Sequence, residues 1–175
     1  MSGDWRSQVL KFWFGLDPAQ HWKADPDLDH RIKQDFLKIW VEKRQLPVDS
    51  FLTDSLTALA GVILFDQLPR NMFRGTADAY ATDHLALAIA KGAIDKDLDE
   101  LPKDERKFLY MPFQHSESLE DQNRSLLLFA ELGDEEQIRY SKHHHDIVER
   151  YGRFPHRNAI LGRAIAPRRG FRGRG

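Results

Sequence analysis

Apolar residues recur along this chain every three or four positions, with polar residues between them. This spacing is typical of helices that bury one face, and nowhere does the sequence show the strict alternation that indicates strands. Short connections between the segments favour stacked antiparallel helical hairpins, so the predicted fold class is all-α. The pattern predicts seven or so helices, at about residues 4–14, 27–44, 50–68, 77–91, 102–111, 118–132 and 135–151.

The third predicted helix is the most apolar and is expected to lie at the centre of the fold. We expect Leu59 and Ile63 to be almost completely buried there. Pro69 disfavours the helical conformation at the residue before it, so this helix should end near Leu68. Its predicted apolar face consists of Leu52, Leu56, Leu59, Ala60 and Ile63.

Glycine, proline and capping residues predict where other helices begin and end. Gly92 is expected to end the fourth helix and Pro112 the fifth. Gly133 and Gly152 should end the last two helices, and Asp134 should cap the start of the last one. In the helix over 118–132, the side chains expected to face inward are Leu119, Leu126, Leu127 and Ala130.

The composition of the 175 residues, 41% hydrophobic, is typical of a globular chain, and we expect one domain over residues 1–163. The absence of cysteine and of an apolar N-terminal signal favours a cytoplasmic protein. The apolar runs are too short for a membrane span.

Charge is spread unevenly along the chain. The net charge is −1, but residues 163–175 hold five arginines and no acid, which leaves about −6 on residues 1–162. A mildly acidic body disfavours nucleic-acid binding. The Arg/Gly-rich segment over 164–175 is expected to be a disordered tail, although such segments can also contact RNA.

Three stretches combine charged residues with aromatic or proline-bounded turns: 56–75, 110–122 and 146–158. Charges in such places need partners, so the stretches are predicted to meet around one polar pocket. Its arginines would favour a small anionic ligand or a peptide end, whereas the alternative is a purely structural clamp, with Asp66 paired to Arg70 or Arg74. The candidate pocket residues are Asp66, Gln67, Arg70, Asn71, Arg74, His115, Glu117, Arg153, His156, Arg157 and Asn158.

Catalytic motifs are missing. Ser116 adjoins His115, but sequence neighbours rarely form a nucleophile–base hydrogen bond, and no Gly-x-Ser-x-Gly elbow is present. The histidines at 143–145 point three ways around a helix and cannot jointly bind one ion, although His145 and Glu149 have one-turn spacing. We therefore assign no metal and no cofactor. A binding module is the preferred function, and the alternative is a hydrolase with His115 or His156 as base, with or without a metal.

Four stretches resemble a bacterial family of uncharacterised proteins, domain of unknown function nine-two-four. They are VLKFWFG at 9–15, ILFDQLPRNMFRGTADAYATD at 63–83, FLYMPFQHSESLEDQ at 108–122 and HHDIVERYGRFPHRNAILGR at 144–163. The resemblance implies a tetratricopeptide-like helical fold over about residues 5–163 and implies no activity. The chain departs from the family pattern at His145, where arginine is usual, and after Arg163.

Overall fold

The computed structural model describes residues 3–164, which form two compact units. The N-terminal unit ends at Pro112, and the C-terminal unit begins at Phe113. The single domain predicted over residues 1–163 stays a prediction. The predicted disorder over 164–175 concerns a segment that, apart from Ala164, lies outside the described residues.

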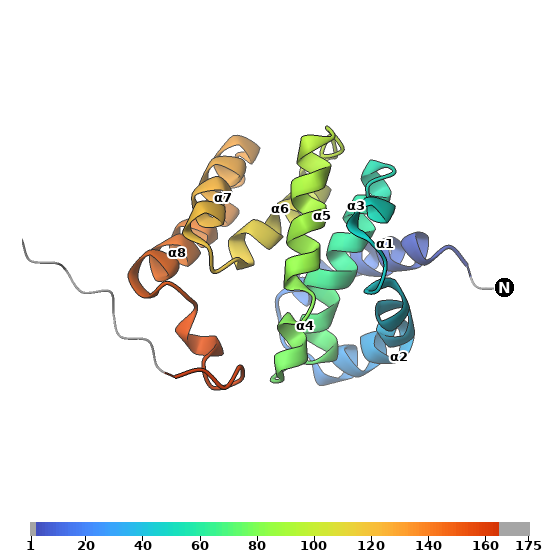
Figure 1. The fold of residues 1–175 in the computed structure, drawn as a ribbon. Helices are drawn as coiled ribbons and strands as arrows, with labels where there is room; N and C mark the ends of the chain where they lie inside the picture. The colour runs from blue at the N-terminus through green and yellow to red at the C-terminus, as the bar shows by residue number, and fades with distance from the viewer. Residues whose placement is uncertain (1–2, 165–175) are drawn as a thin grey trace, which may run out of the picture. The chain divides into compact units, whose positions relative to one another are not determined.

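Every regular element in the described residues is a helix, and none is a strand, which confirms the all-α class (Figure 1). The tetratricopeptide-like arrangement stays a prediction. None of these helices combines the length and the apolar character needed to cross a membrane. The α-helices are α1 (Trp5–Gly15), α2 (Pro26–Lys43), α3 (Ser55–Val62), α4 (Leu68–Met72), α5 (Asp83–Asp95), α6 (Lys103–His115), α7 (Leu119–Leu132) and α8 (Glu135–Tyr151). Short 3-10 turns form at Pro18–His21, Val48–Phe51, Ala77–Tyr80 and Pro155–Arg157, and a π-helical turn forms at Ile63–Gln67.

The core of the N-terminal unit is built around α3 and the π-helical turn that follows it. These segments pack against α1 and α5, and the side chains of Leu59 and Ile63 are completely buried, as predicted. Leu56, in contrast, is exposed, so its assignment to the apolar face was wrong. It lies in the first turn of α3, and the continuous buried run begins only at Thr57.

The central helix does not end near Leu68, so that prediction was also wrong. In the π-helical turn, the Leu68 amide donates to the carbonyl of Ile63, five residues earlier, and the chain continues directly into α4. Pro69 then falls in the first turn of α4, where its missing N–H removes no helical hydrogen bond. The carbonyl of Phe65, four residues before Pro69, accepts a hydrogen bond from the Thr82 hydroxyl at 2.7 Å. The wide turn therefore lets a proline lie within a continuous helical path.

Gly92 lies inside α5 and does not end it, which contradicts the prediction. The helix continues to Asp95, and its predicted start at residue 77 is instead a separate 3-10 turn. A Cβ atom on Gly92 would lie 2.4 Å from Cδ1 of Leu52, closer than two carbon atoms can approach. The glycine therefore leaves room for Leu52 to pack against α5, and any side chain here would force Leu52 to shift.

An aromatic group surrounds Phe108 in the N-terminal unit. Trp13, Phe14 and His21 meet its ring edge-on, with centroids 5.3–5.8 Å away. Trp22 lies parallel to the same ring at 5.9 Å. Side chains from α1, the turn after it and α6 therefore share one core.

Pro112 was expected to end α6, but this helix runs on to His115. A proline inside a helix removes one hydrogen bond and bends the axis, yet it does not force an end where packing holds both sides. Phe108, Leu109, Met111 and Phe113, which flank it, are at most 1% exposed. Burial of these side chains outweighs the local cost of the proline.

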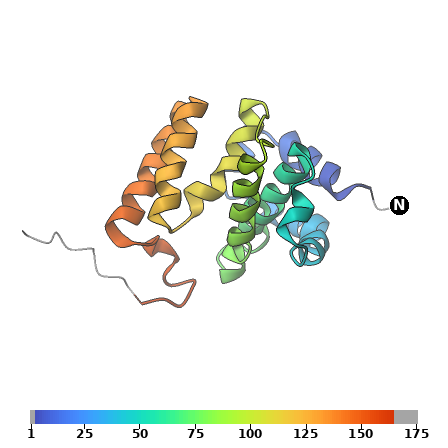
Figure 2. The same cartoon turned by 45° about the horizontal axis from the view of Figure 1, so that its top comes forward.

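The C-terminal unit contains the helical hairpin of α7 and α8, which lie side by side in both views (Figures 1 and 2). Its boundaries follow the sequence prediction. Gly133 and Gly152 end the two helices with positive φ angles of 76° and 71°, a conformation that glycine adopts without strain. The Asp134 side chain caps α8 by accepting a hydrogen bond from the Gln137 amide.

The inward face of α7 was predicted incorrectly. The side chain of Leu127 is 72% exposed, Leu119 and Ala130 are also exposed, and Leu126 is only partly buried. The face that is buried is more polar, so a search for apolar spacing selected the wrong side of the helix. It consists of Asp121, Gln122, Ser125, Phe129 and Leu132.

Candidate functional site

The candidate residues divide between the two units. Asp66, Gln67, Arg70, Asn71 and Arg74 belong to the N-terminal unit, and the other six belong to the C-terminal unit. The expectation that both sets line one pocket stays a prediction. Within each unit, the structure shows what every candidate side chain contacts.

Arg70 joins the π-helical turn to the start of α5. Its two terminal nitrogens donate to Asp83 at 2.7 and 2.9 Å, and Nη1 also donates to the Asp66 carbonyl at 2.8 Å. Burial acts to lower the pKa of Arg70, but the charges of Asp66 and Asp83 outweigh it and raise that pKa above its usual value. Arg70 is therefore a half-buried cation held by acidic residues of its own unit.

Asn71 and Arg74 both reach Asp29 on α2. The Asn71 amide donates to Oδ1 of Asp29 at 2.9 Å, while Arg74 donates from Nε to Oδ2 at 2.8 Å and from Nη2 to Oδ1 at 3.2 Å. The hydrogen bond to Asp29 raises the pKa of Arg74. These contacts fasten the end of α4 to α2. The clamp hypothesis paired Arg74 with Asp66, whereas its ion-pair partner is Asp29.

Asp66 and Gln67 lie within the π-helical turn and are buried. Nε2 of Gln67 donates to Oδ2 of Asp66 at 2.9 Å and contacts the sulfur of Met111 at 3.2 Å. Turns of this type often mark functional sites, but the printed sequence alone gave no sign of this one.

Glu117 organises the candidate residues of the C-terminal unit. Its Oε2 accepts the Phe154 amide at 2.6 Å, and its two oxygens accept from Arg163 at 2.7 and 3.1 Å. Burial acts to raise the pKa of Glu117, but the hydrogen bonds from Arg163 and Phe154 outweigh it and hold that pKa below its ordinary value. Arg163 was not among the predicted site residues. It lies 46 positions from Glu117 in the sequence, and their ion pair connects the segment before α7 to the segment after α8.

Arg157 and Asn158 are buried beside this pair. Nη2 of Arg157 donates to the His115 carbonyl at 3.2 Å, and its guanidinium lies 4.6 Å from the Phe154 ring centroid. The carbonyl of Asn158 accepts the Arg163 amide at 2.8 Å. Both residues therefore help to shape the turn after α8.

Arg153 and His156 are the more accessible members of the set. The guanidinium of Arg153 is partly exposed and donates to the Ala164 carbonyl at 3.3 Å. Among the described residues it forms no ion pair with a carboxylate. His156 is exposed, and its ring centroid lies 5.7 Å from that of Phe154.

His144 was not among the candidate site residues, because the sequence distinguished it from its neighbours only by its direction around the helix. Its Nδ1 lies 2.7 Å from the Tyr140 carbonyl, so the proton sits on Nδ1 and the lone pair on Nε2. The ring lies 6.3 Å from that of His115, and burial lowers the pKa of His144 to about 4. The helical spacing from Ser141 and Val148, both buried, was the signal that could have revealed it.

The structure gives Ser116 a structural partner. Its hydroxyl donates to Asp121 at 2.7 Å and accepts the Ser118 amide at 3.1 Å. These contacts order the start of α7. A hydrolase with His115 or His156 as base stays an untested prediction.

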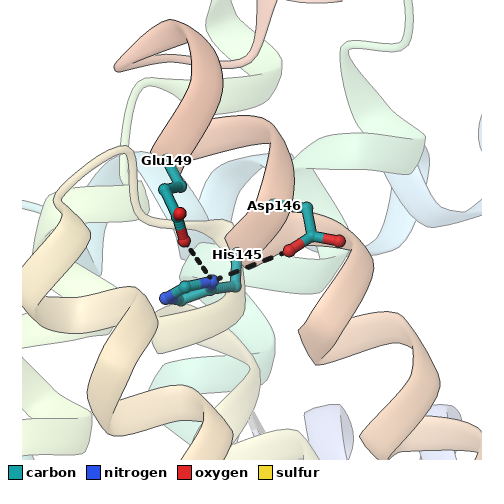
Figure 3. A group of neighbouring side chains, drawn as sticks. All are labelled: His145, Asp146 and Glu149. Atoms are coloured by element: carbon teal, nitrogen blue, oxygen red, sulfur yellow. Dashed lines mark ion pairs between the residues drawn. The ribbon is translucent and has the colours of Figure 1, made fainter. Parts of the chain in front are cut away.

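One group of described side chains brings metal-binding atoms together on α8 (Figure 3). It consists of His145, Asp146 and Glu149, whose donor atoms all lie within 4.8 Å of one another. The one-turn spacing of His145 and Glu149 predicted this proximity, whereas the contribution of Asp146 was not foreseen.

The chain was compared with known proteins. Over residues 9–169 it matches the family model described as "Bacterial protein of unknown function (DUF924)". A solved structure, titled as a protein of unknown function, ATU0120, from Agrobacterium tumefaciens, is similar with a TM-score of 0.87 and 37% sequence identity. The match covers 93% of this chain and 92% of that one. A comparison with curated proteins found no match.

Proposed function

The chain belongs to the DUF924 family of bacterial proteins of unknown function, and we propose that it is a non-enzymatic binding module for a small anion or the carboxylate end of a peptide. The proposed site is the turn that follows α8. The observation that carries the proposal is the state of Arg153, which is partly exposed and, within the described residues, bonded to a carbonyl only.

The charge of this segment supports the proposal. Residues 150–163 contain four arginines and no aspartate or glutamate. Arg163 is engaged by Glu117, and Arg157 is packed on Phe154, so these two hold the turn in shape. Of the three arginines in the turn after α8, Arg153 is then the one that a ligand can reach, and a spare positive potential attracts anions.

The chemistry of the guanidinium group also fits. Its planar N–H groups match two oxygens of a carboxylate or phosphate, and this pairing is stronger than one between neutral groups. The weak, 3.3 Å bond to the Ala164 carbonyl leaves donors of Arg153 for such a ligand.

Calorimetric titration of the full chain with phosphate and with small carboxylates tests the proposal. Arg153→Gln should weaken anion binding about tenfold, the order of one charge-assisted pair, without lowering the denaturation midpoint. Arg150→Gln is the matched control, because it removes the same charge from an exposed site in the last turn of α8, three residues before Arg153. Absence of binding in the parent chain, together with clear destabilisation by Arg153→Gln, would leave the structural clamp as the better explanation.

A further inference from the structure

His145, Asp146 and Glu149 present one nitrogen and two carboxylates on a single turn of α8 (Figure 3). Nδ1 of His145 lies 3.4 Å from Oε2 of Glu149 and 4.0 Å from Oδ1 of Asp146. The imidazole is largely buried, with 14% of its side chain exposed, whereas the two carboxylates are well exposed. A fixed nitrogen donor therefore stands beside two adjustable oxygen donors.

A residue of the other helix fixes the orientation of the ring. Nε2 of His145 lies 2.7 Å from the side-chain oxygen of Asn123 on α7. Because an oxygen acceptor at that distance requires the proton on Nε2, the lone pair of the neutral ring lies on Nδ1. That lone pair faces the side on which the two carboxylates lie, so a cation placed between the three groups would be favoured by all of them.

We propose that this group binds a divalent transition-metal ion such as Zn²⁺ or Co²⁺. Nδ1 of His145 and one oxygen each from Glu149 and Asp146 would be the protein ligands. Bonds of about 2.1 Å in tetrahedral geometry place ligand atoms about 3.4 Å apart, which matches the separation of His145 from Glu149. The 4.0 Å separation from Asp146 closes by a small rotation of an exposed side chain.

Asn123 has the role that a carbonyl or carboxylate commonly has behind a metal-bound imidazole: it holds the tautomer and the ring direction. The choice of ion follows from the donors, since imidazole with carboxylates suits Zn²⁺ and its neighbours better than Ca²⁺ or Mg²⁺. Three protein ligands leave at least one position for water. The proposal does not depend on the anion site after α8.

A proton is the competing cation, because an imidazolium ion would satisfy the same two carboxylates. The two occupants are distinguished by stoichiometry and by ligand set. A metal binds in a one-to-one ratio and is displaced as the pH falls, and it requires each carboxylate as a ligand.

The test is titration of the metal-free full chain with Zn²⁺ by calorimetry and with Co²⁺ by visible absorption. One ion should bind per chain. His145→Gln and Glu149→Gln should each weaken it at least tenfold, and Asn123→Ala should weaken it about tenfold through loss of ring orientation. Glu149 and Asn123 are exposed, so circular dichroism should show both of their variants to be folded.

His143→Gln is the matched control. It removes an exposed histidine of the same run that takes no part in the group, and binding should be unchanged. The proposal is overturned if no stoichiometric ion binds, which would leave the proton as the occupant. It is equally overturned if His143→Gln weakens binding as much as Glu149→Gln does, since the histidine run would then bind the ion without a defined site.

Discussion

Replacement of Glu117 by glutamine is the sharpest test of what holds the C-terminal unit together. The substitution keeps the size and shape of the side chain and removes its charge. One of its two acceptor oxygens becomes an NH₂ group that faces a donor, either the Phe154 amide or the Arg163 guanidinium. At least one of the three hydrogen bonds made to Glu117 is therefore replaced by a repulsive contact.

The expected loss can be bounded from the structure. An exposed ion pair contributes about 0–1 kcal/mol, and removal of one partner from a fully buried pair costs about 3–5 kcal/mol. Both side chains of the Glu117–Arg163 pair are 26% exposed, which places them between these limits. Each hydrogen bond to a charged group is worth about 1.5–3 kcal/mol, so after allowance for solvent screening we expect a loss of about 2 kcal/mol at pH 7.

The effect should depend on pH in a defined direction. The pKa of Glu117 in the folded protein lies below its ordinary value of 4.5, so its stabilisation is fully present above that value. It is lost as the pH falls through the lower pKa of the folded state. The difference in unfolding free energy between parent and Glu117→Gln should therefore be largest near neutrality and shrink in acid.

Urea denaturation followed by far-ultraviolet circular dichroism, repeated from pH 7 to pH 3, measures this difference. Hydrogen exchange at the Phe154 amide adds a local readout, because that amide should lose protection in the variant. Glu131→Gln is the control, since it removes an exposed charge near the end of α7. A loss below about 0.5 kcal/mol, the usual range for a surface substitution, or a difference that stays constant with pH, would refute the reasoning.

Three further expectations concern the N-terminal unit. Ile63→Ala should cost about 2–5 kcal/mol in chemical denaturation because its side chain is fully buried, whereas exposed Leu56→Ala should cost little. Gly92→Val should lower the free energy of unfolding by about 1–3 kcal/mol, and with it the thermal midpoint, because the valine side chain would overlap Leu52. An unchanged midpoint would contradict the close packing. Arg70→Met should cost about 2 kcal/mol in urea denaturation because it removes the half-buried ion pair with Asp83 on α5, and a stabilised variant would show that the ion pair is dispensable.

The helix boundaries that the sequence predicted correctly depend on local chemistry. Asp4 and Asp134 cap helices through hydrogen bonds to residues two or three positions away. Gly133 and Gly152 supply a left-handed conformation that few other residues adopt without strain. Such signals are complete within one turn of helix and need no knowledge of the fold.

The boundaries that failed depend on distant residues. By local rules Pro69 predicts the end of a helix, but the π-helical turn places it in the first turn of α4. The Thr82 hydroxyl then donates a hydrogen bond to the Phe65 carbonyl in the π-helical turn. Gly92 likewise predicts the end of a helix by local rules, but it lies inside α5, where the side chain of Leu52 packs against it. Local rules cannot report contacts that only the folded chain creates.

The candidate site shows the same division. The sequence identified Arg70, Arg74 and Glu117 as charges that need partners, because each lies beside an apolar or aromatic segment. It could not identify Asp83 and Arg163 as those partners, and Asp29, the partner of Arg74, lies 45 positions away in the chain. The preference for a partner is a property of the residue, whereas its identity is a property of the fold.

The aromatic group around Phe108 holds two of the tryptophans of the chain, Trp13 and Trp22, and their position has a spectroscopic consequence. All four tryptophans, at positions 5, 13, 22 and 40, precede Pro112 and belong to the N-terminal unit. Intrinsic tryptophan fluorescence is therefore a built-in reporter of that unit, whereas circular dichroism sums the helices of both. If the two signals change at the same denaturant concentration, the chain unfolds as one cooperative domain. If the dichroism changes in two steps and the fluorescence in one, the fluorescence identifies which of the two steps is the unfolding of the N-terminal unit.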